Sequence, residues 1–337
     1  MYILFRDSRI RDILKDSGTV AVMKIAIVGP GALGTLFAAF FCRSGVDATL
    51  LDYRPDRVSK LARSGVVVEA GEETFHLHPQ VISWEQAISR NSNFDVILLL
   101  VKAYVTSHIL EELQSISHRN TLIITLQNGI GHEQILSRAF SKRQIVIGTT
   151  AIGANKPSDN LVRFAGHGQT RLGFAFNDHS HLSELKQFLA RMQKAGFQGE
   201  ITVDIKWHLW QKLFANVGIN AITALLCGKN GVLLQVKHAR QVMVAAVKEA
   251  VDLHNHLFFR QADLDHVIAY IDSICENTCE NISSMLQDRL FHRFTEIDYI
   301  NGAVVRISLE SGLQAPVNST LTSLIKALQV LKWKNIV

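Results

Sequence analysis

The first 150 residues alternate short apolar runs with stretches that carry a helical period or turn residues. The apolar runs have the length and the β-branched content of strands that are buried on both faces. They cover residues 25–28, 48–51, 96–101, 122–126 and 145–150. Strands that alternate with helices build a parallel sheet with helices on both faces, so this pattern predicts an α/β domain.

The pattern changes twice further along the chain. Residues 160–174 contain two short strand-like segments around Gly166 and Gly168, which predicts a hairpin or a pair of antiparallel strands added to the sheet. After residue 203 the strand signals end. Helices are then expected at residues 204–226, 237–257, 263–288, 294–311 and 317–333.

This change predicts two domains, one over residues 23–203 and an all-α one over residues 204–337. No Gly/Ser-rich linker separates them, so we expect them to pack directly and to hold a ligand in the cleft between them. Residues 1–22 continue neither pattern: they are charged, and they lack an apolar core of signal-peptide length. We expect them to be either a surface extension of the protein or the result of a translation start that is assigned too far upstream.

The composition is that of a globular protein. Hydrophobic residues make up 47% and charged residues 19% of the 337 residues, and the net charge of +5 comes from scattered Lys and Arg. The longest apolar runs are far shorter than a membrane span. We therefore expect a cytoplasmic protein that binds a small anionic ligand and neither membranes nor nucleic acid.

Cysteine spacing gives no sign of a metal site. The four cysteines, Cys42, Cys227, Cys275 and Cys279, match no zinc-binding pattern, and the histidines show no ligand spacing either. Cys275 and Cys279 are four residues apart in a predicted helix, so both are expected to be buried thiols on one face. We expect no metal.

The most specific motif joins the first predicted strand to the first predicted helix, and it runs Gly29-Pro30-Gly31-Ala32-Leu33-Gly34. In this context Gly29 permits the tight turn, Gly31 lets a pyrophosphate approach the backbone, and Gly34 allows the helix to pack on the strand. The helix start adds free N–H groups and the positive end of its dipole. The motif predicts a Rossmann-like domain that binds a nicotinamide dinucleotide along residues 29–34.

The end of the second predicted strand bears on the choice between NAD and NADP. Asp52 stands where an acidic residue would bind the adenosine ribose of NAD and repel a 2′-phosphate. Arg54 and Arg57 follow within a few residues and could bind that phosphate. The residues by themselves leave the choice open.

Polar residues interrupt two otherwise apolar helical stretches. Lys212, Asn216 and Asn220 are spaced by four and therefore lie on one face of a helix that is apolar elsewhere. Such a stripe either faces a polar substrate or forms a satisfied internal network, because buried polar groups need partners. A second polar stretch covers residues 280–288 and 295–302, where acidic residues could equally cap helices or face solvent.

Taken together, these motifs resemble the ketopantoate reductase (2-dehydropantoate 2-reductase) family, over nearly the whole chain from Met23. The resemblance rests on the glycine-rich turn, on the helix with Lys212, and on the segments 101–103 (Val-Lys-Ala), 127–131 (Gln-Asn-Gly-Ile-Gly), 230–231 (Asn-Gly), 280–288 and 295–302. It implies reduction of 2-dehydropantoate to pantoate by NADPH, a step toward pantothenate and coenzyme A, with NAD as the alternative cofactor.

The resemblance also implies roles for single residues. Lys212 matches the catalytic lysine and Glu296 the essential acidic residue of the family. The expected substrate contacts are Asn216, Asn220, Asn230 and Ser284. The expected cofactor contacts, beside the glycine-rich turn, are Arg54, Lys102 and Asn128, although the family usually has its arginine about one residue before Arg54.

These residue types suit the reaction. Hydride delivery to a ketone leaves negative charge on its oxygen, and a lysine ammonium can stabilise that charge and supply the proton. With an ordinary pKa of about 10.4, Lys212 would be protonated at neutral pH. Two other readings remain open: a reductase of another 2-oxo acid, and a non-catalytic dinucleotide sensor, which would not need a proton donor. The oligomeric state is expected to be a monomer or a homodimer.

Overall fold

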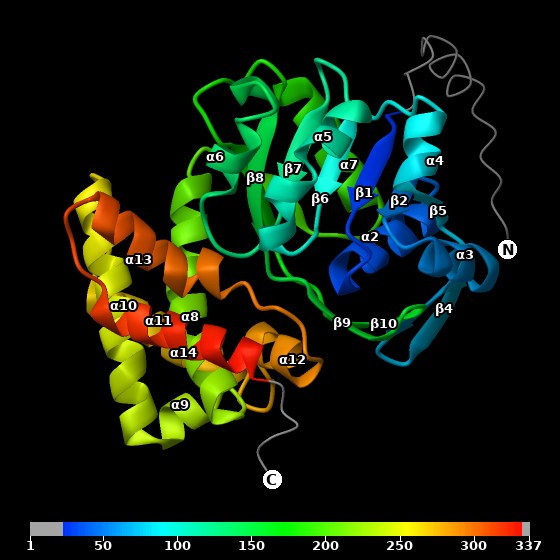
Figure 1. The fold of residues 1–337 in the computed structure, drawn as a ribbon. Coiled ribbons are helices and arrows are strands. Elements are labelled where there is room, and N and C mark those ends of the chain that lie inside the picture. The colour runs from blue at the N-terminus through cyan, green and yellow to red at the C-terminus, as the bar shows by residue number, and fades with distance from the viewer. Residues whose placement is uncertain (1–22, 332–337) are drawn as a thin grey trace, which may run out of the picture.

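The structure is a computed structural model that describes residues 23–331 (Figure 1). The predicted extension at residues 1–22 and the end of the last predicted helix lie outside the described residues.

An eight-stranded sheet occupies the first part of the chain, with the strand order β12-β11-β8-β7-β6-β1-β2-β5. The strands are β1 (Ile25–Val28), β2 (Ala48–Asp52), β5 (Gln80–Ser83), β6 (Val96–Leu99), β7 (Leu122–Thr125), β8 (Ile145–Thr150), β11 (Thr170–Phe174) and β12 (Gly199–Ile201). Every neighbouring pair is parallel except β8 with β11, which is antiparallel. The predicted Rossmann-like parallel sheet is therefore confirmed.

Helices cover both faces of this sheet, as strand β1 illustrates. Ile25 and Ile27 pack in one core with Phe37 of helix α2 (Ala32–Arg43), while Ala26 and Val28 point to the other face and pack in a second core. The other helices of this part are α3 (Pro55–Ser64), α4 (Trp84–Ser89), α5 (Leu110–Ser115), α6 (His132–Leu136) and α7 (Leu182–Lys194), with short 3₁₀ turns at Ala103–His108 and Lys142–Gln144.

A second sheet of four strands lies beside the first, in the order β4-β3-β10-β9. Its strands are β3 (Val66–Ala70), β4 (Glu73–Leu77), β9 (Gly153–Ser158) and β10 (Leu161–Gly166). Strands β9 and β10 form a hairpin, which Figure 1 shows arching below the main sheet. Helix α2 contacts both of its strands.

The prediction for residues 160–174 was wrong in its pairing. Both strands exist, but β10 pairs with β9 and β3, whereas β11 joins the large sheet beside β8. The hairpin turn instead falls at Asp159 and Asn160, between β9 and β10. Strands β3 to β5 were also missed, because β3 and β4 are short and partly exposed and give no continuous apolar run.

The chain after β12 is helical in the described residues, as predicted. The helices are α8 (Ile205–Leu226), α9 (Val232–Gln235), α10 (Lys237–Leu257), α11 (Leu264–Asn277), α12 (Ser284–Leu290), α13 (Asn301–Glu310) and α14 (Pro316–Val330), with a 3₁₀ turn, η3, at Ile297–Tyr299. Helix α8 is apolar around most of its circumference and contacts α10, α11, α12 and α14. It is therefore the central helix of this part.

Two predicted helices are interrupted. The predicted helix 263–288 breaks into α11 and α12, because the Ser283 side chain accepts the N–H of Leu286 and starts a new helix there. Cys279 lies in that break and is exposed, so its predicted burial was wrong. Cys275 is buried in α11, and this burial raises the pKa of its thiol to about 11. The predicted helix 294–311 begins as η3 and becomes α-helical only at Asn301.

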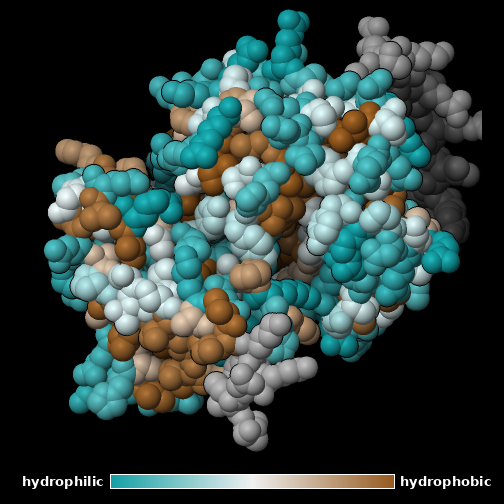
Figure 2. Space-filling view, in the orientation of Figure 1, coloured by the Kyte–Doolittle hydropathy of each residue, from teal (hydrophilic) through white to brown (hydrophobic). Residues whose placement is uncertain are grey.

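Figure 2 shows a mostly hydrophilic face, with a hydrophobic area over the helical part near α14. Leu324 and Val330 are exposed side chains of that helix. Between residues 23 and 331, no helix is both long and apolar enough to cross a bilayer.

Candidate active site

The glycine-rich turn has the geometry that a bound pyrophosphate requires. Gly29 has a φ of +114°, and a Cβ there would lie 2.6 Å from the backbone nitrogen of Val101. A Cβ on Gly34 would lie 2.0 Å from the carbonyl oxygen of Gly29, whereas one on Gly31 would meet no described atom within 4 Å. Gly29 and Gly34 thus close the turn, and Gly31 leaves open space beside the backbone.

Helix α2 begins at this open space. Within residues 23–331, no side chain caps its N-terminus, and Gly31 is exposed while Ala32 and Leu33 are partly exposed. The first N–H groups of the helix therefore remain available to an anion. The residues present fit a dinucleotide.

The carboxyl ends of β1, β2, β6 and β7 meet at this edge of the sheet because the strands are parallel. Asp52 ends β2 and is almost fully buried. Arg57 of α3 binds both of its carboxylate oxygens, with a distance of 2.7 Å from Nη2 to Oδ1. The negative charge of Asp52 is consequently offset by an arginine.

Arg54 does not share that ion pair through its side chain. Its backbone N–H donates to Oδ1 of Asp52 at 3.2 Å. Its guanidinium instead faces Asp159, at 3.4 Å, and Asp56, at 3.5 Å. The two arginines that the sequence left undecided therefore have different partners.

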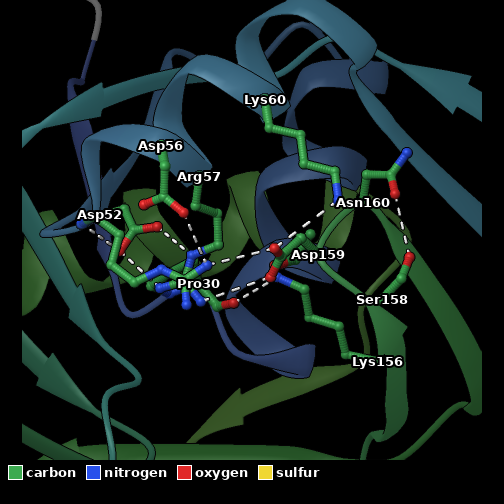
Figure 3. A network of polar contacts seen from close by, with 11 residues as sticks. Pro30, Asp52, Asp56, Arg57, Lys60, Lys156, Ser158, Asp159 and Asn160 are labelled. Atoms are coloured by element: carbon green, nitrogen blue, oxygen red, sulfur yellow. Dashed lines mark hydrogen bonds and ion pairs between the residues drawn. The ribbon is translucent and has the colours of Figure 1, made fainter.

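A lysine that the sequence analysis missed lies on the glycine-rich turn. The Nζ atom of Lys156, in β9, donates to the carbonyl oxygen of Pro30 at 2.6 Å and to Oγ1 of Thr35 at 3.0 Å. Burial, and the nearby charge of Arg57, lower its pKa to about 8. Figure 3 shows Lys156 and Asp159 of the hairpin converging with Arg57 and Lys60 of α3 on this region. No local motif marks Lys156, because the hairpin reaches the turn only in the folded chain.

Glu296 is the centre of the second polar cluster. It is buried, and its Oε1 accepts the N–H of Ala103 at 3.1 Å while its Oε2 accepts from Nδ2 of Asn128, also at 3.1 Å. Lys102 places its Nζ 3.6 Å from the same carboxylate. The structure therefore brings together three residues that the sequence assigned to the site: Lys102, Asn128 and Glu296.

Close backbone packing explains why a glycine follows Asn128. A Cβ on Gly129 would lie 2.1 Å from the carbonyl oxygen of Tyr299, and Gly129 has a φ of +89°. The next residue, Ile130, donates its N–H to that same oxygen at 3.2 Å. The loop after β7 thus packs directly against η3, the turn that follows Glu296.

Asp288 adds a carboxylate to this cluster. Its Oδ2 lies 2.6 Å from Nζ of Lys102. Burial alone would lower the pKa of Lys102, but the charges of Glu296 and Asp288 outweigh that effect and raise it. Burial also raises the pKa of Asp288, although the charge of Lys102 lowers it in part. The sequence placed Asp288 in a motif but gave it no role.

Lys212 extends from α8 to the end of strand β8. Its Nζ donates to the carbonyl oxygen of Thr150 at 2.9 Å. Burial lowers the pKa of this lysine to about 8, although the charge of Glu296 raises it in part. The expected value of about 10.4 was therefore too high. Lys212 is still mostly protonated at neutral pH.

The four predicted substrate contacts lie on α8, just before α9 and at the start of α12. Ser284 is the first residue of α12 and is exposed, and Asn216 is partly exposed one turn after Lys212. Asn220 is buried, and within the described part of the chain its Nδ2 has no hydrogen-bond partner. Asn230 is also buried; its Nδ2 donates to Oγ1 of Thr278 at 2.9 Å, but its Oδ1 lacks a partner there.

The polar stripe on α8 is not a fully satisfied network within the described residues, because Nδ2 of Asn220 has no partner there. Across residues 23–331, no hydrogen bond joins these four side chains to Lys212 or Glu296, so the protein alone does not connect them. A buried polar atom without a hydrogen-bond partner costs free energy, and a polar ligand that bonds to the atom removes this cost. No group of three or more His, Cys, Asp or Glu side chains suited to a metal occurs in the described residues.

A Rossmann-like sheet that presents Lys102 and Asn128 at its strand ends, against helices that supply Lys212 and Glu296, is the arrangement of a Rossmann-fold oxidoreductase. The family model "Ketopantoate reductase PanE/ApbA" matches residues 25–176, and the model of that family's C-terminal domain matches residues 204–329. The chain belongs to the ketopantoate reductase family.

Individual relatives agree with this assignment. The chain is 31% identical over 313 residues to a 2-dehydropantoate 2-reductase of Pyrococcus horikoshii, covering 92% of this chain and 98% of that protein. It is 30% identical over 308 residues to that of Archaeoglobus fulgidus, covering 91% and 98%.

Solved structures show the same fold. A D-mandelate dehydrogenase with NADH and anilino(oxo)acetate superposes with a TM-score of 0.85 at 26% identity, over 91% of this chain and 98% of that one. A 2-dehydropantoate 2-reductase from Geobacter metallireducens superposes with a TM-score of 0.80 at 27% identity, over 90% and 99%.

Proposed function

We propose that this protein reduces 2-dehydropantoate to pantoate with NADPH. The observation that carries the proposal is the buried ammonium of Lys212, which is held by the carbonyl of Thr150 and lies in the field of Glu296. The overall reaction consumes one 2-dehydropantoate, one NADPH and one proton, and yields pantoate and NADP⁺. A place in the synthesis of pantothenate and coenzyme A belongs to the same proposal.

Lys212 is the proton donor in this proposal. An ammonium has three N–H groups, and the Thr150 carbonyl engages one of them. The others are free to bind the ketone oxygen, where they stabilise the developing negative charge and then release a proton to it. The carbonyl of Thr150 fixes the position of Nζ at the end of strand β8.

The cofactor, when bound, supplies the hydride. Backbone N–H groups at Gly31, Ala32 and Leu33 would hold its pyrophosphate. Lys102 and Asn128, both beside Glu296, would face the nicotinamide end of the site. Because Arg57 offsets the charge of Asp52, the acidic residue at the end of β2 repels a 2′-phosphate less than an isolated aspartate would. Arg54 would contact that phosphate, which favours NADPH over NADH.

The substrate residues follow from the family resemblance and, for Asn220 and Asn230, from buried polar atoms that lack a partner in the described residues. We assign the substrate carboxylate and hydroxyl to Ser284, Asn216, Asn220 and Asn230, since these side chains bind such groups without adding charge. Glu296 can accept a hydroxyl hydrogen and keep Lys212 oriented. The proposal also divides the chain into a dinucleotide-binding domain, residues 23–203, and a helical catalytic domain, residues 204–337, with substrate between them.

A second candidate is the reduction of another 2-oxo acid. The observation that favours it is the similarity to the D-mandelate dehydrogenase, whose ligand in the solved structure is an oxoacetate derivative. The same lysine would serve both reactions, and only the substrate pocket would differ. A dinucleotide sensor is the weaker alternative, because a binding module needs no buried lysine as a proton donor.

Steady-state oxidation of NADPH and of NADH tests these candidates directly. The substrates are 2-dehydropantoate, phenylglyoxylate and 2-oxobutanoate, each with both cofactors. We expect the highest kcat/KM with 2-dehydropantoate and NADPH. A higher value with another oxo acid would favour the second candidate, and cofactor binding without turnover of any of them would favour a sensor. Fractionation and sedimentation would test the proposed cytoplasmic location and the state as monomer or homodimer.

A further inference from the structure

The turn of the β9–β10 hairpin delivers a carboxylate to the adenosine end of the cofactor site. Asp159, in this turn, lies 3.4 Å from Nη2 of Arg54, 3.9 Å from Nη1 of Arg57 and 4.0 Å from Nζ of Lys60. All three cations come from α3 or the residue just before it. Figure 3 shows the Asp159 carboxylate at the meeting point of the α3 side chains and the hairpin.

Asp159 is the carboxylate that the three cations share. Arg57 already binds the buried Asp52, so the carboxylate of Asp52 largely offsets the charge of Arg57. Arg54 also faces Asp56, but the Asp56 side chain is 77% exposed, and that contact is weak in water. Asp159 is therefore the one carboxylate within 4.0 Å of Arg54, Arg57 and Lys60 alike in the described residues.

We propose that the Asp159 carboxylate holds the place of the 2′-phosphate of NADPH and thereby sets the preference between NADPH and NADH. The inference rests on the proposed function, because it presumes a dinucleotide at the glycine-rich turn. A 2′-phosphate and a carboxylate are both anions with several acceptor oxygens, and both bind best to converging guanidinium and ammonium groups.

The two cofactors place different demands on this arrangement. The adenosine ribose of NADH carries only hydroxyl groups, so Asp159 can keep its cations while NADH binds. The phosphate of NADPH must take those cations from Asp159, and it then faces a carboxylate of the same sign nearby. Asp159 consequently weakens NADPH binding and leaves NADH binding nearly unchanged.

The test is the binding of each cofactor in the absence of substrate. Titrations of NADPH and of NADH, followed by the quenching of protein fluorescence, give Kd values for the wild type and for Asp159→Asn. The Asn side chain keeps the size and one acceptor oxygen but removes the charge. Glu69→Gln is the matched control, since Glu69 pairs with Arg163 on the same four-stranded sheet and, in the described residues, forms no ion pair with Arg54, Arg57 or Lys60.

We expect Asp159→Asn to lower the Kd for NADPH by about tenfold and to change the Kd for NADH less than about twofold. The size of the first effect follows because the variant loses a few partly exposed ion pairs and one charge of the same sign as the phosphate. Glu69→Gln should change neither. An unchanged NADPH/NADH ratio, or equal weakening of both cofactors, would overturn the inference alone, because equal weakening means that Asp159 only supports the structure. A wild type that binds neither dinucleotide would overturn the proposed function and this inference with it.

Discussion

The Nζ atom of Lys102 lies 2.6 Å from Oδ2 of Asp288, although 186 positions separate the two residues. Lys102 follows strand β6 of the large sheet, and Asp288 lies in helix α12 of the helical part. Their ion pair, together with the contacts of Glu296 to Ala103 and Asn128, joins the helical part to the carboxyl edge of the sheet. The candidate chemistry is located at this junction.

Replacing Lys212 tests the proton donor. Lys212→Ala should lower kcat by about 10²- to 10⁴-fold, because the ketone oxygen loses both its stabilising charge and its proton source. Cofactor binding should change little, as fluorescence titration can check. Lys206→Ala is the control, since Lys206 is exposed on the first turn of the same helix. Near-normal turnover in Lys212→Ala would remove this lysine from the mechanism.

The lowered pKa of Lys212 predicts the pH dependence of reduction. The reaction needs the ammonium form, which is lost as the pH rises through a pKa of about 8. The kcat/KM profile, which reports on the enzyme before substrate binds, should therefore be flat on the acid side of that value and fall about tenfold per pH unit above it. A profile that stays level up to pH 10 would contradict the burial of this charge.

Glu296→Gln should move that profile as well as lower its plateau. The charge of Glu296 raises the pKa of Lys212, so its removal should lower that pKa and shift the falling limb toward acid pH. Loss of the charged acceptor for Ala103 and Asn128 should cost about 1.5–3 kcal/mol, or roughly ten- to a hundredfold in kcat/KM. Glu310→Gln, at the exposed end of α13, is the control. A reduced plateau with an unmoved limb would mean that Glu296 acts on position only.

Two adjacent serines separate substrate binding from stability. Ser283 caps α12 and accepts the hydroxyl of Thr223 at 2.8 Å, so Ser283→Ala should lower the free energy of unfolding by about 0.5–2 kcal/mol. Ser284 is exposed and caps nothing, so Ser284→Ala should leave unfolding unchanged but raise KM about ten- to a hundredfold. Urea unfolding and steady-state kinetics on both variants decide this. The reverse pattern would mean that Ser283, and not Ser284, contacts the substrate.

Lys156 should contribute to the binding of either cofactor, because it lies on the glycine-rich turn that both would occupy. Lys156→Met keeps much of the aliphatic stem and removes the charge, so the Kd for NADPH and for NADH should rise together by roughly tenfold. Lys142→Met, whose lysine lies over the ring of Phe176 away from the turn, is the control. An effect on NADPH only would place Lys156 at the 2′-phosphate instead.

Local patterns in the sequence were sufficient for a large part of the fold. The strand–turn–helix at residues 25–43 and the two long helices α8 and α10 depend on short-range features: a continuous apolar strand, glycines at close backbone approaches, and unbroken helical periodicity. Strand β8 and helix α10 have the predicted bounds. Lys102, Asn128 and Glu296 could be proposed as site residues only through the family resemblance, because none of them stands in a pattern that requires their contact.

Other features depend on contacts between distant segments, and only the tertiary structure decided them. The pairing of β10 with β9 and β3, rather than with β11, brings Asp159 to Arg54 and Lys156 to the glycine-rich turn. The pKa of Lys212 falls because the folded chain buries its ammonium, and spacing along α8 contains no measure of that burial. Residue type and period act over a few residues, whereas charge pairing and desolvation depend on which segments the completed fold places side by side.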